Sequence, residues 1–158
     1  MRARTIFAAL FLAGLVLATA GADDKKAGDD ADKAALQGTW QAVSSEMDGD
    51  KQPEDEVKLY TLVFSGDKLV VNKAGDCVME GTVTLDAAQD PKHLDLKLEK
   101  NPGNPDDVGK TMPGIFAVKG DELKWCFTLP GGGTERPKEF KTEAGSGRVS
   151  AVMKREKK

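Results

Sequence analysis

The chain has 158 residues, of which 31% are charged and 39% are hydrophobic, which is typical of one globular domain. A formal net charge of −3 excludes a general electrostatic attraction to nucleic acid or to an anionic membrane surface. With one histidine and two cysteines, the chain lacks the ligands of the usual four-ligand zinc site.

Residues 1–20 have the pattern of a secretory signal peptide. Arg2 and Arg4 precede an apolar run over residues 5–17, and small residues follow it. The run is too short to favour a transmembrane helix. We therefore expect cleavage after Ala20 or Ala22 and export to the periplasm or the extracellular space, with an uncleaved N-terminal anchor as the alternative. Cleavage after either alanine changes the net charge from −3 to −5, and we expect no stable membrane insertion of the mature chain.

Residues 21–35 consist of Asp, Lys, Ala and Gly and contain no large apolar side chain. A segment that cannot bury apolar surface tends to stay disordered. We therefore expect a disordered, charged leader over residues 21–35, followed by a folded domain over residues 36–156.

Short strand patterns separated by turn signals fill this domain. Alternation is clearest in residues 93–99, where Leu94, Leu96 and Leu98 share one face. Residues 53–56 are compatible with one helical turn. Strands are expected over residues 38–47, 59–64, 68–72, 77–85, 93–99, 111–119, 122–129, 137–141 and 148–155. Eight or nine short antiparallel strands, each with one apolar face, predict an all-β fold, namely a small up-and-down β-barrel.

A series of short motifs follows a characteristic order along the domain. It begins with Gly38-Thr39-Trp40 inside residues 36–40 and continues through residues 66–69, 81–86, 91–96, 109–111, 114–116, 120–127, 136–137, 139–140 and 145–147. In this order the motifs resemble a family of secreted, lipocalin-like domains that is abundant in planctomycete bacteria and has no known activity. The resemblance implies a lipocalin-like barrel and carries over no catalytic residues.

The resemblance also implies structural roles for Gly38, Trp40 and Arg155. In lipocalins the tryptophan of the Gly-Xaa-Trp motif closes one end of the barrel, and an arginine near the last strand packs over it. Arg155, with Lys154 beside it, matches that arginine, and a cation–π contact would contribute about 0.5–2 kcal/mol. The chain departs from true lipocalins in its short length and in having no recognisable C-terminal helix.

Cys77 and Cys126 leave two interpretations open. An exported chain with an even number of cysteines can form one disulfide. The strand phase argues against it, because Cys77 lies on the apolar face of its strand whereas Cys126 lies opposite the face of Leu123 and Trp125. One β-bulge would repair that phase.

No set of residues points to catalysis. His93, the single histidine, lies on the polar face of its strand without a neighbouring nucleophile, and we interpret it as a solvent-exposed residue. We accordingly expect no enzymatic activity, no cofactor and no metal site.

Five side chains are candidates for the wall of a ligand cavity: Leu62, Phe64, Val83, Trp125 and Phe127. The alternative is plain core packing, because side chains often fill eight-stranded barrels. The leading hypothesis is an exported, non-enzymatic domain that binds a small apolar ligand or a cell-envelope component such as an envelope protein. The alternative hypothesis is a structural or protein-interaction module with a filled barrel.

Overall fold

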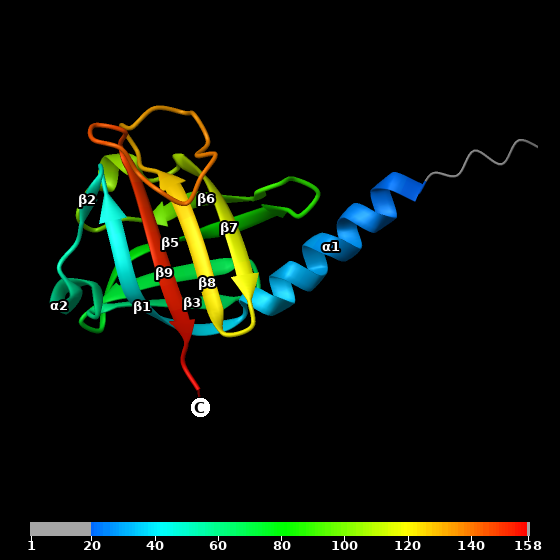
Figure 1. Ribbon diagram of the computed structural model, residues 1–158, viewed down its shortest axis with the longest axis horizontal. Helices are drawn as coiled ribbons and strands as arrows, with labels where there is room; N and C mark the ends of the chain where they lie inside the picture. Colours follow the sequence, from blue (N-terminus) through cyan, green and yellow to red (C-terminus); the bar gives the residue numbers. More distant parts are fainter. Residues whose placement is uncertain (1–19, 158) are drawn as a thin grey trace, which may run out of the picture.

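Eight antiparallel strands close into one barrel (Figure 1). In the computed structural model, which describes residues 20–157, successive barrel strands pair with each other and β1 closes the ring by pairing with β9. A short ninth strand, β2, pairs only with the end of β1. The strands are β1 (Gly38–Met47), β2 (Asp50–Lys51), β3 (Tyr60–Ser65), β4 (Lys68–Lys73), β5 (Asp76–Asp86), β6 (Lys92–Lys100), β7 (Thr111–Lys119), β8 (Glu122–Thr128) and β9 (Arg148–Arg155). The predicted small all-β barrel is confirmed.

The alternation of side chains explains the closed sheet. Leu94, Leu96 and Leu98 on β6 are each at most 1% exposed, as are Phe116 on β7 and Phe127 on β8. These side chains belong to one apolar cluster inside the barrel. Closure pairs every long strand on both sides and leaves no long sheet edge to aggregate.

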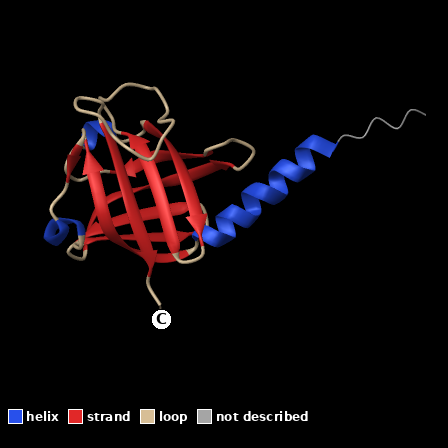
Figure 2. Ribbon diagram, in the orientation of Figure 1, coloured by secondary structure: helices blue, strands red, loops and turns tan. Residues whose placement is uncertain are grey.

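The two ends of the barrel differ. Helix α1 (Ala20–Leu36) meets the barrel at one end, near the tight turns that join β3 to β4 and β7 to β8. The other end carries the short helix α2 (Glu54–Val57), strand β2 and two long loops over residues 101–110 and 129–147, the first of which contains the 3-10 turn η1 (Pro105–Asp107). The long loop over residues 129–147 is prominent above the strands in Figure 2.

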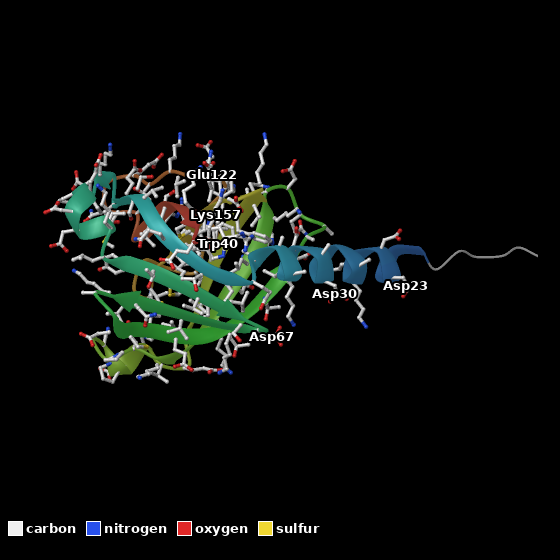
Figure 3. All side chains as sticks on the ribbon, turned by 90° about the horizontal axis from the view of Figure 1, so that it is seen from below. Asp23, Asp30, Trp40, Asp67, Glu122 and Lys157 are labelled. Atoms are coloured by element: carbon white, nitrogen blue, oxygen red, sulfur yellow. The ribbon has the colours of Figure 1, made fainter. Side chains whose placement is uncertain are left out.

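The prediction of a disordered leader over residues 21–35 is wrong, because these residues lie in α1. Alanine and lysine favour the helix, and contacts with the barrel fix its C-terminal half. Asp29 accepts a 2.7 Å hydrogen bond from the Ala87 amide, Lys92 pairs with Asp32 at 2.7 Å, and Leu36 is 1% exposed. The half of the helix that carries Asp23 extends beyond the barrel, whereas Asp67 lies near the point where α1 meets the barrel (Figure 3).

The predicted strand over residues 137–141 is also wrong. This segment belongs to the loop over residues 129–147, and β2 brings the number of strands to nine. The β1–β9 pairing leaves no free edge beside these residues. Side chains bind the loop instead: Glu46 Oε1 accepts hydrogen bonds from the Thr142 amide and hydroxyl, both at 2.7 Å.

The other predicted segments agree with the structure to within one residue at each end. This includes the predicted helical turn at residues 53–56, which is α2. Residues 1–19 of the predicted signal peptide lie outside the described residues.

Candidate functional site: the barrel interior and its mouth

The barrel holds a cavity of about 530 Å³. Fifteen of its twenty described wall residues are apolar, among them the predicted candidates Leu62, Trp125 and Phe127. The rings of Trp125 and Phe127 pack edge to face with centroids 5.0 Å apart. The Phe127 ring lies over Gly114, where any Cβ atom would collide with it. The volume lies within the range of about 300–1,000 Å³ that is usual for small-molecule sites.

The predictions for Phe64 and Val83 are wrong, because neither residue lines this cavity. Both border a separate hollow of about 320 Å³ between α1 and the barrel, together with Leu36. Phe64 stands at the end of β3 that meets α1. The sequence pattern identified their inward face but not their height along the barrel axis.

The end of the barrel next to α1 is closed by Trp40 and Arg155. Arg155 Cζ lies 4.2 Å from the centroid of the fully buried Trp40 ring. The same guanidinium group donates hydrogen bonds to the carbonyls of Gln37 and Ala35, at 2.5 and 2.6 Å. The Trp40 indole N–H donates to the Leu36 carbonyl at 2.8 Å. The predicted contact between Trp40 and Arg155 is therefore present.

Gly38 and Lys154 are the other two residues near this end that the sequence analysis named. Gly38 has a φ of 109°, a backbone conformation that residues other than glycine rarely adopt. The backbone therefore explains why the Gly-Xaa-Trp motif has glycine at this position. Lys154 points elsewhere and pairs with Glu122 at 2.7 Å. Arg155, rather than its lysine neighbour, packs over the tryptophan.

The opposite end is the mouth of the cavity, where the wall becomes polar. Gln52, Glu56 and Lys73 all belong to the wall there, and Lys73 Nζ lies 2.8 Å from Glu56 Oε2. The same ammonium group lies 5.3 Å from the centroid of the Tyr60 ring. The hydrogen bond with Glu56 is the main cause that raises the pKa of Lys73, so this side chain stays cationic.

This ion pair was not predicted from the sequence. Glu56 was expected only as part of a helical turn at residues 53–56, and the expected strand ended at residue 72, one residue before Lys73. The signal that could have found it is the alternation Leu69, Val71, Lys73, which continues the inward face of β4 to a charged residue. The position of α2 over the mouth depends on the fold and has no such signal.

A β-bulge at Val78 reshapes one side of the cavity. Val71 pairs with Met79 whereas Asn72 pairs with Cys77, so Val78 has no partner on β4. Val78 and Met79 both reach the cavity wall as a result. The bulge reverses the phase of Cys77, which pairs with the outward-facing Asn72 rather than lying on the apolar face.

The predicted option of a disulfide between Cys77 and Cys126 is wrong, because both cysteines are free. The phase is not the obstacle. Cys77 lies on β5 and Cys126 on β8, with β6 and β7 between them. Three strand spacings of about 4.8 Å each far exceed the reach of a disulfide.

Cys126 is buried on the outward face of β8 and His93 is half-buried on the outward face of β6. Burial raises the pKa of the Cys126 thiol to about 11. Burial, followed by the charge of Arg136, lowers the pKa of His93. Arg136 itself binds Asp95 at 2.6 Å. Neither Cys126 nor His93 lines the cavity.

Metal-binding clusters and membrane-spanning helices are both absent from residues 20–157. No group of three or more His, Cys, Asp or Glu side chains in this range is placed to hold a metal ion. In the same range no helix has the length and apolar character needed to cross a membrane.

No protein-family model matches the chain, and no curated protein matches it significantly.

Proposed function

We propose that the protein is an exported, non-enzymatic binding protein that holds a small apolar molecule inside its barrel. The observation that carries this proposal is the cavity of about 530 Å³ with a predominantly apolar wall. A small molecule gains by moving apolar surface from water into such a space, by about 25 cal/mol for each Å² buried. The same volume argues against the alternative of a filled barrel.

We also propose that the protein is exported and belongs to the secreted, lipocalin-like family. Export rests on the signal-peptide pattern of residues 1–20. Membership of the secreted, lipocalin-like family rests on the ordered motifs of the sequence. The Trp40–Arg155 closure supports it, since the resemblance implies this contact.

A titration with the uncharged fluorescent probe N-phenylnaphthylamine tests cavity binding. Wild-type protein is expected to bind it and increase its fluorescence. Ala151→Phe places a phenyl ring in the cavity wall and should weaken binding by at least about ten-fold. Ala117→Phe adds the same ring at an exposed position on β7 and should bind like the wild type.

Circular dichroism establishes that both variants keep the barrel. Equal binding by wild type and by folded Ala151→Phe would place the probe elsewhere and contradict the proposal. Absence of probe binding by the wild type would favour the filled-barrel alternative.

A further inference from the structure

The polar mouth suggests which class of ligand the cavity accepts, an inference that rests on the proposed function. Among the twenty described wall residues, Glu56 and Lys73 are the only charged ones. Both are at the mouth, while the interior beyond them is apolar. A wall of this kind matches a molecule with an apolar body and one charged end.

Lys73 is the better fixed of the two charges. It lies at the end of β4, directly across from Tyr60 on β3, and its ammonium group packs over the Tyr60 ring. Its position continues the inward row of Leu69 and Val71. A cation held by a sheet and by an aromatic ring is a preorganised anion partner.

Glu56 is the partner that a ligand can replace. It belongs to the four-residue helix α2, outside the ring of strands, and its side chain is 53% exposed. It forms its ion pair with Lys73 in a half-exposed setting, where such pairs contribute little. A ligand carboxylate could take its place while Glu56 returns to water, so no charge is left buried without a partner.

We propose that the cavity binds a single-chain amphiphile whose apolar tail fills the barrel and whose anionic head replaces Glu56 beside Lys73. A cationic head would instead have to displace Lys73 from both Glu56 and Tyr60. A neutral head would leave the Glu56–Lys73 pair as it is and gain nothing from it.

Competition titrations against bound N-phenylnaphthylamine test the head group with three probes that share one tail: dodecanoate, dodecanol and dodecylammonium. Lys73→Met should weaken the binding of dodecanoate by about ten-fold or more, because a hydrogen bond to a charged group is lost. The same substitution should change the affinity for dodecanol by less than about two-fold, because the tail contacts remain. Glu56→Gln removes the competing carboxylate and should strengthen the binding of dodecanoate.

Lys97→Met is the matched control, since Lys97 is an exposed lysine on the outward face of β6. This variant should bind all three probes with the affinities of the wild type. Retained binding of N-phenylnaphthylamine by each variant shows that the barrel and its cavity are intact.

The outcomes separate this inference from the function on which it rests. If dodecanol and N-phenylnaphthylamine bind but Lys73→Met affects dodecanoate and dodecanol equally, the anionic head is overturned and cavity binding stands. If the wild type binds dodecylammonium more tightly than dodecanoate and the Glu56→Gln variant loses this preference, the anionic head is overturned in favour of a cationic head. If no probe binds, the proposed function and this inference both fail.

Discussion

At the scale of single residues, the two cysteines differ in their surroundings. Cys126 is fully buried on the outward face of β8, and its thiol lies 3.7 Å from the Lys141 carbonyl of the loop over residues 129–147. Burial raises the pKa of this thiol to about 11. Cys77 is half-buried beside the bulge of β5. Because the thiolate is the reactive form, the two side chains should react at different rates.

We predict two free thiols with different labelling rates. In native protein, Cys77 should react with a maleimide at least about ten-fold faster than Cys126. The single variants Cys77→Ser and Cys126→Ser assign the two phases, and mass spectrometry follows them. Equal rates would contradict the burial of Cys126. Absence of thiols in denatured, unreduced protein would contradict the strand order itself.

At the scale of secondary-structure elements, Arg155 joins the last strand to the segment before the first one. Its guanidinium group contacts the Trp40 ring and the carbonyls of Ala35 and Gln37, so α1, β1 and β9 meet at one side chain. The Ala35 carbonyl belongs to the last turn of α1 and the Gln37 carbonyl follows directly after the helix, so Arg155 lies at the C-terminal end of α1, where a positive charge is favourable. The contacts of Arg155 therefore fix the C-terminal end of α1 against the closed end of the barrel.

The substitution Arg155→Leu should lower the free energy of unfolding by about 2–4 kcal/mol, through loss of the cation–π contact and of two charged hydrogen bonds. Urea unfolding measures the change. The control is Lys157→Met, because Lys157 has an 83% exposed side chain and should matter by less than about 0.5 kcal/mol. If the Arg155→Leu variant is as stable as the control, Arg155 does not fasten the closed end.

The barrel strands were predictable because their residues alternate. Leu94, Leu96 and Leu98 define the face of β6 without knowledge of its neighbours. Helix α1 was not predictable in this way, because Leu36 at its end is its one large apolar residue. Two of its other anchors, Asp29 and Asp32, bind Ala87 and Lys92, which are distant in the sequence. The loop at residues 137–141 looked like a strand, but a closed barrel offers it no edge.

At the scale of the whole molecule, one closed and one open end turn a small barrel into a cup. Trp40 and Arg155 close one end, and the ion pair of Glu56 and Lys73 stands at the other. The closure and part of the cavity wall were predictable from the sequence, because motif and alternation are local properties. The mouth was not predictable, because a helix from outside the barrel brings Glu56 to Lys73.

Methyl NMR tests most directly the proposal that an apolar molecule binds inside the barrel. The methionines of residues 20–157 all line the cavity: Met47, Met79, Met112 and Met153. Ile115 is a buried methyl-bearing control on the outward face of β7. With bound dodecanol, we predict nuclear Overhauser effects from the alkyl chain to the Met112 and Met153 methyl groups and none to Ile115. Saturating dodecanol without any contact to Met112 or Met153 would contradict the account.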